Sequence, residues 1–170
     1  MEYKFSQKWT EEDYVTFAMN HLLLSFFKTQ NIILYTISIG YLLITPLLTE
    51  RWEFFYVGIG LLLLLGGYLI MARRAAVKGY ERNKDSLSIN FTLNEQGLIY
   101  ETLDGKITDK WEQFYSVKET EKYFFMYFAA QKGFIVAKRD LTEEMVLFIR
   151  KNLLEHVVNQ KRIKLLVKKY

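Results

Sequence analysis

The sequence has 170 residues, which is enough for one ordinary domain or a small domain with an appendage. It is 51% hydrophobic and 25% charged, so a mainly disordered chain is excluded. It has no cysteine and two histidines, which excludes disulfides, thiolate metal sites, iron–sulfur clusters and multi-histidine metal centres. We therefore predict no cofactor and no metal.

Residues 1–30 are predicted to form a strand followed by an amphipathic helix. Apolar and polar side chains alternate over 3–9, as in a half-buried strand. Thr10 is placed to cap a helix that begins at Glu11 and ends near Lys28. We interpret this helix as lying on a membrane surface, and the alternative is an ordinary helix packed on the C-terminal domain.

Two apolar runs follow, at about 32–48 and 54–72, and neither contains a charged residue. A membrane-spanning helix needs about twenty apolar residues. The alternative is a pair of buried helices in a soluble core, but a chain of this length has too little protein to cover them. The short link between the runs joins antiparallel neighbours, so we predict a transmembrane hairpin over 31–72.

Positive charges flank this hairpin unevenly, and they predict its orientation. The loop between the runs contains only Arg51, whereas six basic residues lie on the other side: Lys28, Arg73, Arg74, Lys78, Arg82 and Lys84. Basic residues near span ends stay in the cytoplasm. We expect a cell-membrane protein with two spans, both termini in the cytoplasm, and a basic juxtamembrane linker at 73–84.

Small residues are predicted to bring the two helices of the hairpin together, because they allow close approach where lipid gives no hydrophobic drive. Gly60 and Gly67 are seven residues apart and share one face of the second helix. Their expected counterparts on the first helix are Ser38, Gly40 and Thr45.

The pattern changes to period two in the last domain, 85–170. Six strands are predicted, at 87–93, 98–103, 106–111, 115–121, 123–130 and 134–138. A final helix starts after Thr142, and its apolar stripe includes Phe148. We expect Trp111, at the end of the third strand, to face Phe148 in the core. The fold class is therefore α+β: a small bent antiparallel sheet or barrel with a C-terminal helix.

Charge is segregated along the chain. Residues 85–158 hold nine basic and twelve acidic residues, whereas 73–84 sum to +4 and 159–170 to +5. Basic clusters at the cytoplasmic face attract anionic lipid. The candidate lipid-surface residues are Arg73, Arg74, Lys78, Arg82, Lys84, Lys161, Arg162, Lys164, Lys168 and Lys169. Alternatively, the first cluster only sets topology and the second is a solvated helix end.

Motifs for chemistry are lacking. The sequence has no glycine-rich nucleotide loop and no G-x-S-x-G elbow. The apolar runs carry no ionisable side chain except tyrosine, which argues against a pump or transporter. The C-terminal domain is acidic, which argues against nucleic acid as a partner. We predict that the protein is not an enzyme.

Four groups of residues carry a resemblance to a known family. They are the acidic helix start Thr10-Glu11-Glu12-Asp13-Tyr14, the strand start Gly97-Leu98-Ile99, the segment from Trp111 to Val117, and Ile135-Val136-Ala137-Lys138-Arg139. With two spans between the first group and the rest, the chain resembles the YcxB-like family of bacterial membrane proteins. This family more often has proline where Ala137 stands. The resemblance implies a C-terminal domain similar to the bacterial pleckstrin-homology-like fold, and it carries over no catalytic residue.

The fold implied by this resemblance normally has seven strands, one more than the C-terminal domain supplies. We therefore hypothesise that the strand at 3–9 pairs with an open edge of the C-terminal sheet. The rival interpretation is that this segment docks on lipid through Tyr3, Phe5 and Trp9.

The expected function is a non-enzymatic, membrane-anchored binding or regulatory module. Its cytoplasmic pleckstrin-homology-like domain would contact a protein partner or anionic membrane lipid, and immunity or stress response is a related role. The alternative is a structural or regulatory subunit of a larger membrane complex, with the hairpin as its interface. A homo-oligomer is compatible with either.

Overall fold

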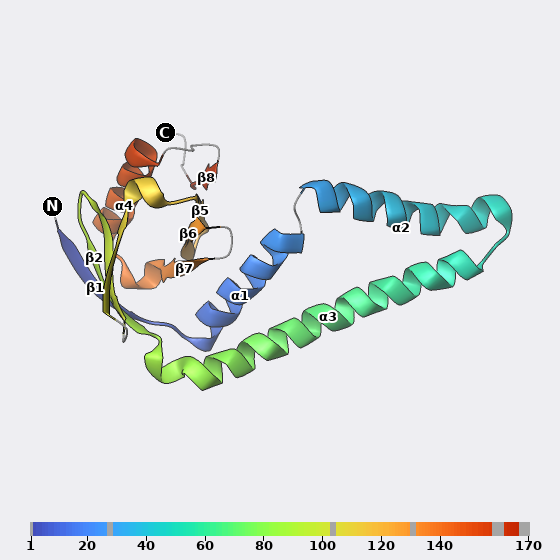
Figure 1. The fold of residues 1–170 in the computed structure, drawn as a ribbon, viewed down its shortest axis with the longest axis horizontal. Helices are drawn as coiled ribbons and strands as arrows, with labels where there is room; N and C mark the ends of the chain where they lie inside the picture. Colours follow the sequence, from blue (N-terminus) through green and yellow to red (C-terminus); the bar gives the residue numbers. More distant parts are fainter. Residues whose placement is uncertain (1, 27–28, 103–104, 130–131, 158–161, 167–170) are drawn as a thin grey trace. The chain divides into compact units, whose positions relative to one another are not determined.

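A computed structural model describes residues 2–26, 29–102, 105–129, 132–157 and 162–166 (Figure 1). The chain divides into two compact units. One consists of Met1–Asp13 together with Arg82–Tyr170, and the other is Tyr14–Glu81. The first unit is thus built from the two ends of the chain, and the second is inserted between them.

The inserted unit is helical, as the apolar runs predict. Its helices are α1 (Glu11–Phe26, which begins in the first unit), α2 (Thr29–Thr49) and α3 (Glu53–Asn83). α2 and α3 are both long and apolar enough to cross a membrane, and only 11% and 6% of their apolar windows are buried. Helices from the core of a soluble protein would be mostly buried, so this exposure argues against that alternative.

α3 is longer than the predicted second span. It continues through the basic segment to Asn83 and is followed by a short 3-10 helix, η1 (Lys84–Ser86). The segment 73–84, which we predict as a linker, is therefore mostly regular helix. Alanine, arginine, lysine and glutamate dominate it, and all of them favour helix. Near its end, Gly79 lies against Tyr14 of α1, where an added Cβ would come within 3.0 Å of the hydroxyl.

The N-terminal strand joins the C-terminal domain, which confirms that hypothesis. β1 (Tyr3–Lys8) pairs antiparallel with β2 (Ser88–Leu93), and the register runs from Tyr3 opposite Leu93 to Lys8 opposite Ser88. Trp9 extends the contact, because its backbone N–H donates to the carbonyl of Leu87 at 3.0 Å.

The rival interpretation of this strand, docking on lipid, is wrong. Tyr3 and Phe5 point into the domain instead, where the Tyr3 ring lies 5.3 Å from Phe148 and the Phe5 ring stacks 5.0 Å from Phe91. Trp9 is only 7% exposed. All three aromatic side chains are therefore used by the fold of this domain.

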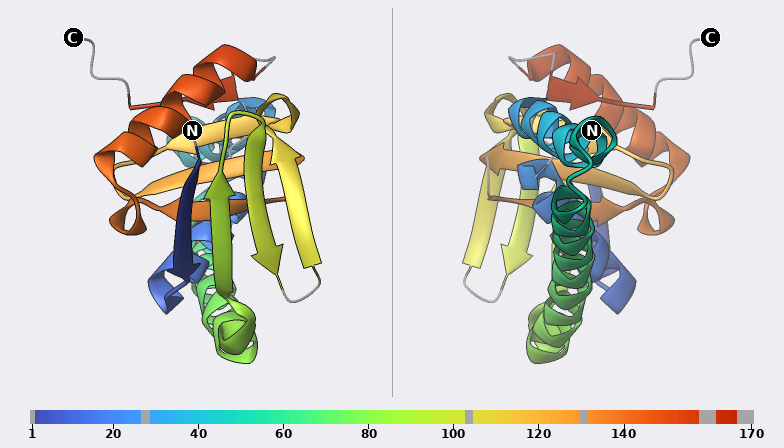
Figure 2. Two further views of the ribbon diagram at one scale, coloured as in Figure 1. Left: turned by 90° about the vertical axis from the view of Figure 1, so that its left-hand side faces the viewer. Right: turned by 90° about the vertical axis from the view of Figure 1, so that its right-hand side faces the viewer.

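Two four-stranded sheets form the domain, and Figure 2 shows their strands crossing. The first has the order β1-β2-β3-β4, with β3 at Gly97–Thr102 and β4 at Gly105–Lys110. The second has the order β7-β6-β5-β8. Its strands are β5 (Ser116–Glu119), β6 (Tyr123–Ala129), β7 (Lys132–Ala137) and β8 (Ile163–Lys164). The predicted bent sheet is thus two small sheets, and their neighbours are antiparallel except for β5 and β8.

β8 is absent from the sequence prediction. It lies in the basic tail and pairs in parallel with β5, so the interpretation of this tail as a solvated helix end is wrong for 162–166. The last helix, α4 (Glu143–His156), ends earlier. It begins as predicted, because the Thr142 side chain accepts a hydrogen bond from the backbone N–H of Met145.

The core brings Trp111 and Phe148 together. Trp111 is 1% exposed, and its ring centroid lies 6.5 Å from that of Phe148. Trp111 does not end β4, however, but begins a short 3-10 helix, η2 (Trp111–Gln113). Another short 3-10 helix, η3 (Lys138–Asp140), lies between β7 and α4. The Trp111 indole N–H donates to the carbonyl of Asn94 at 2.9 Å, so the tryptophan also fixes the β2–β3 turn.

Gly97, in the strand start that contributes to the resemblance, has a steric role. A Cβ at this position would lie 2.2 Å from the carbonyl oxygen of Asp109. β3 and β4 therefore approach one another closely enough here to require glycine.

The first testable prediction concerns β1. A chain in which a flexible linker of roughly ten residues replaces Tyr14–Glu81 should fold, because it keeps the β1–β2 pairing. The fragment 82–170 leaves the edge of β2 unpaired and should be less stable or aggregate. Urea unfolding followed by circular dichroism compares the two, and equal stability would contradict a structural role for β1.

In the joined chain, Trp111→Ala should reduce the free energy of unfolding by about 3–5 kcal/mol, the usual cost of truncating a buried aromatic. Ile107→Ala on β4, where the side chain is 42% exposed, is the matched control and should cost much less. The urea midpoints of both variants test this, and equal losses would contradict the assignment of Trp111 to the core.

Candidate functional site

No metal centre is found in the part of the chain that the structure describes: no group of three or more His, Asp or Glu side chains is placed to hold an ion. Three other features of the strand-rich unit are built from polar side chains. They are a buried carboxylate at Asp13, a second at Glu119, and a groove along α4. Each is described in turn.

Asp13 lies at the start of α1 and belongs to a reciprocal cap. Its backbone N–H donates to Thr10 Oγ1 at 3.3 Å, and the Thr10 N–H donates to Asp13 Oδ2 at 2.8 Å. Arg139, in η3, binds the same carboxylate with both terminal nitrogens, at 2.7 and 2.6 Å. The Asp13 side chain is 0% exposed and that of Arg139 is 44% exposed, so this bidentate pair is buried on one side only.

Burial alone would raise the pKa of the Asp13 carboxyl, but the hydrogen bonds from Arg139 and Thr10 outweigh it and hold the pKa below its ordinary value of 3.8. Tyr123 also donates to this carboxylate. Burial and that hydrogen bond raise the pKa of Tyr123 to about 12. Asp13 is therefore charged at neutral pH and holds η3 to the root of α1.

Glu119, at the end of β5, is the second buried carboxylate, with a fully covered side chain. Arg150 of α4 donates to it through Nε at 3.1 Å and through Nη2 at 2.6 Å. Lys138 makes a short ion pair with the same Oε1 atom. The backbone N–H of Leu166 donates to Oε2 at 2.9 Å. One carboxylate thus joins β5, η3, α4 and the C-terminal segment.

Burial would also raise the pKa of Glu119, and the hydrogen bonds from Arg150, Lys138 and the Leu166 N–H outweigh it, so the pKa is lower than its ordinary value of 4.5. Two cations and one backbone N–H satisfy a single charge. Glu119 is therefore ionised near neutral pH, and its hydrogen bonds hold β5, η3, α4 and the C-terminal segment together.

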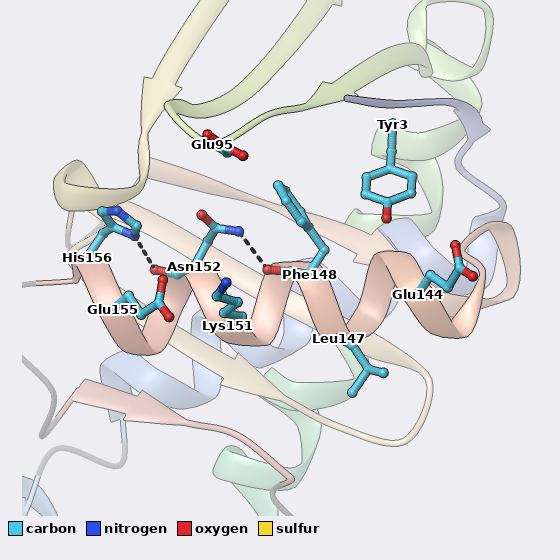
Figure 3. Close-up of a pocket in the computed structure, with 9 residues that line it drawn as sticks. All are labelled: Tyr3, Glu95, Glu144, Leu147, Phe148, Lys151, Asn152, Glu155 and His156. Carbon is cyan, nitrogen blue, oxygen red and sulfur yellow. Dashed lines mark hydrogen bonds between the residues drawn. The ribbon is translucent and has the colours of Figure 1, made fainter. Parts of the chain in front are cut away.

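The third feature is a groove of about 890 Å³ along α4, drawn in Figure 3. It is lined by Tyr3, Glu95, Glu144, Leu147, Phe148, Lys151, Asn152, Glu155 and His156. Tyr3 and Phe148 lie side by side, and Glu95 stands on the facing turn. Three carboxylates against one lysine make the lining negative overall.

Two polar side chains of this groove are engaged with their own helix. The Asn152 amide donates to the carbonyl of Phe148 at 2.8 Å, and His156 Nδ1 lies 3.1 Å from the carbonyl of Asn152. They form an i, i+4 pattern along α4 and are not oriented toward a common reacting atom. These two side chains therefore cap backbone carbonyls of α4.

The candidate lipid-surface residues fall into two groups in the structure. Arg73, Arg74, Lys78, Arg82 and Lys84 are exposed, and the first three line a hollow of about 470 Å³ on α3 with Ile70 and Val77. In the tail, Arg162 and Lys164 are exposed, but the Arg162 guanidinium lies 3.9 Å from the centre of the Tyr115 ring. Lys161, Lys168 and Lys169 lie outside the described residues.

The structure leaves open space beside the three glycines among the helix-packing candidates. A Cβ added at Gly40, Gly60 or Gly67 would have no neighbour within 4 Å, whereas at Gly58 it would lie 3.4 Å from Leu42 Cβ. The Thr45 hydroxyl donates to the carbonyl of Tyr41 in its own helix, and Ser38 is exposed. The spacing of small residues along one helix does not by itself reveal which face of that helix packs against its neighbour.

The sequence predicts Asp13 at a helix start and Lys138-Arg139 at the end of a strand, but it does not bring them together. Both groups were among the residues that carry the family resemblance. The resemblance was therefore the one signal that these charged residues matter. Glu119 had no signal of its own, because nothing in its local sequence marks it as buried.

Comparison with known proteins bears on this same region. The protein-family model described as YcxB-like protein matches residues 93–153. The resemblance to the YcxB-like family is confirmed over this segment. It runs from the end of β2 into α4 and includes Glu119, Arg139 and Arg150. No curated protein and no solved structure matches the chain.

The ion pair on Asp13 predicts a pH dependence. Because its pKa is lower in the folded protein, the stabilisation is complete above the unfolded value of 3.8 and is lost as the pH falls through the folded value. Arg139→Met should lower the free energy of unfolding by about 1–3 kcal/mol at pH 7. The advantage of the native protein over Asp13→Asn should shrink as the pH drops below 4.

Urea unfolding of the full chain in detergent, at pH 7 and pH 3, measures these differences. Each variant is compared with the native protein because Asp109 affects the pH dependence in the opposite direction. Burial raises the pKa of Asp109, whereas the pKa of Asp13 is lowered. Glu12→Gln is the control, since its ion pair with Lys122 at 3.1 Å is exposed and should contribute little. A difference for Asp13→Asn that stays constant with pH would contradict the prediction.

Proposed function

We propose that this protein is a non-enzymatic, membrane-anchored binding module. Its helical hairpin, α2 and α3, anchors the chain in the cell membrane, and its two-sheet domain binds a protein partner on the cytoplasmic side. The observation that carries the proposal is the pairing of β1 with β2, the strands that bracket the hairpin.

This pairing constrains the topology. Met1–Asp13 and Arg82–Tyr170 belong to one folded unit, so the chain enters and leaves the inserted segment on the same side of any membrane. A polar domain with hydrogen-bonded sheets does not straddle the apolar bilayer core. The number of spans is then even, and the two long apolar helices satisfy this requirement. The excess of basic residues on that side favours the cytoplasm.

The strand arrangement supports a pleckstrin-homology-like domain. Four antiparallel strands, β1 to β4, are followed by three more, β5 to β7, and then by α4. That is the count of seven strands and one helix that the family resemblance implies. β8 is an addition to this count.

Charge favours a protein over a lipid as the ligand of this domain. The α4 groove carries three carboxylates and one lysine, which would repel an anionic headgroup. A protein segment with basic and apolar residues fits it better. Contact with anionic lipid is assigned instead to the exposed arginines and lysines that follow the second span, such as Arg73 and Arg74.

A second candidate function uses the hairpin as an interface in a larger complex. The specific observation in its favour is the open space around Gly40, Gly60 and Gly67, which the helices of the described chain leave uncovered. Small residues on an exposed face allow another helix to approach closely. Gly60→Leu and Gly67→Leu should abolish such an assembly without disturbing the soluble domain.

Topology is tested with single cysteines, since the chain has none. Cysteine at Thr49, beside the loop between α2 and α3, should react with an impermeant thiol reagent in intact cells. Cysteine at Ser86, in η1, should react only after lysis. Labelling of the second site alone in intact cells would overturn the orientation.

Binding is tested by photocrosslinking in native membranes. A photoreactive residue at Lys151, in the α4 groove, should crosslink a discrete protein. The same residue at Lys106 on β4, an exposed lysine of the same domain, should not. Crosslinks from Lys151 to lipid, or equal protein crosslinks from both positions, would contradict the proposed function.

A further inference from the structure

The C-terminal segment 162–166 lies along the free edge of β5 as a short extra strand. Ile163 pairs with Val117 and Lys164 with Lys118, in parallel. A strand that pairs in parallel is not joined to its neighbour by a tight turn. The β5 edge can therefore pair with a strand from this chain or from another protein, provided that the strand offers matching backbone groups.

Further contacts extend the pairing at both ends of β8. At one end the Arg162 guanidinium stacks on the Tyr115 ring at 3.9 Å, and the Ser116 hydroxyl donates to the Arg162 carbonyl at 3.1 Å. At the other end the Leu166 N–H donates to Glu119 Oε2 at 2.9 Å. Residues 162–166 thus follow residues 115–119 almost one for one, as a bound peptide would.

The strand that receives this segment is also held from its other side, where β5 pairs antiparallel with β6. Glu119 is fixed by Arg150 and Lys138, both within the body of the unit. Val117 is fully buried with the segment in place, and Tyr115 is 42% exposed with Arg162 stacked on its ring. The edge is therefore a preorganised receptor, and preorganisation lowers the cost of binding.

The occupant, in contrast, is held weakly. Its ladder with β5 is two residues long, and short parallel pairings contribute little stability. Its other contacts among the described residues are one cation–π pair and two hydrogen bonds. A second strand with the same groups displaces it once the concentration of that strand exceeds the effective concentration of the tethered segment. The chemistry of the occupant defines what the edge accepts: a cation, an apolar residue, a cation and two apolar residues in extended conformation.

We infer that the β5 edge is a strand-addition site for an extended basic and apolar segment of a protein partner, and that residues 162–166 are its built-in competitor. The inference rests on the proposed function and specifies the kind of partner. Main-chain pairing with β5 would provide affinity, while Tyr115 and Glu119 would select a leading cation and a free backbone N–H.

The test locks the competitor in place. Lys118 and Lys164 are register partners, and the chain has no cysteine of its own. The full-length variant Lys118→Cys/Lys164→Cys in neutral detergent should form an intramolecular disulfide. Failure to form this bond under oxidising conditions would show that the segment does not lie on β5, and it would overturn the inference.

The probe is a fluorescent peptide containing Lys-Val-Arg-Leu-Leu, which has the pattern of residues 162–166 but a different sequence. The reduced variant should bind it, and the oxidised variant should bind it at least tenfold more weakly, by fluorescence anisotropy. A peptide with proline at the last position lacks the N–H for Glu119 and should also lose tenfold or more, since a hydrogen bond to a charged group is stronger than one between neutral groups. Ser116→Ala and Tyr115→Leu in the reduced protein should each weaken binding several-fold.

Other outcomes overturn the inference. Equal binding by oxidised and reduced protein, or by the two peptides, would mean that the peptide binds elsewhere by charge alone. If anionic phosphatidylglycerol vesicles prevent the disulfide from forming and the peptide does not, the segment is a lipid contact. None of these results alters the topology or the α4 crosslinks, so the inference and the proposed function fail independently.

Discussion

The antiparallel pairing of β1 with β2 joins the start of the chain to the region beyond both apolar helices. It buries Trp9 in the two-sheet domain and packs the half-buried rings of Tyr3 and Phe5 against Phe148 and Phe91. It also brings Asp13 within reach of Arg139, which would otherwise have no buried carboxylate to bind. The composition of the strand-rich unit, with Met1–Asp13 joined to Arg82–Tyr170, depends on this one ladder.

Two adjacent residues, Lys138 and Arg139, distribute the buried charge of the domain. Lys138 pairs with Glu119 and Arg139 with Asp13, so η3 connects the carboxylate beside the C-terminal segment with the carboxylate at the root of α1. Removing either cation leaves a buried negative charge with fewer partners, which costs far more than an exposed pair would contribute. These charges therefore specify how the two ends of the chain meet.

Local patterns in the sequence predict much of the fold. Apolar length predicts α2 and α3, period two predicts the strands of the C-terminal domain, and Thr142 predicts the start of α4. The pairing of β1 was foreseen because an isolated alternating segment needs an edge. The sequence does not reveal β8, whose two residues are too short to show a period, or the end of α3, where charged helix formers hide the continuing helix.

The candidate site is less predictable than the fold for a physical reason. Asp13 and Arg139 are 126 positions apart, and Glu119 and Arg150 are 31 apart, so neither pair belongs to a single element. Burial of a carboxylate depends on what folds over it, which periodicity does not encode. The α4 groove likewise combines a strand from the start of the chain with a helix from its end, and only the three-dimensional arrangement brings Tyr3 beside Phe148.

The order in which the ribosome makes these elements has a consequence for biogenesis. β1 is synthesised first, yet its partner β2 follows the whole of Tyr14–Glu81, so β1 waits as a single strand while both apolar helices emerge. The first sheet is completed only after the hairpin has been made, because Leu93 must return to Tyr3 across a long loop. Folding of the polar domain thus follows synthesis of the two apolar helices, and a nascent chain that ends before Ser88 carries those helices and an unpaired β1.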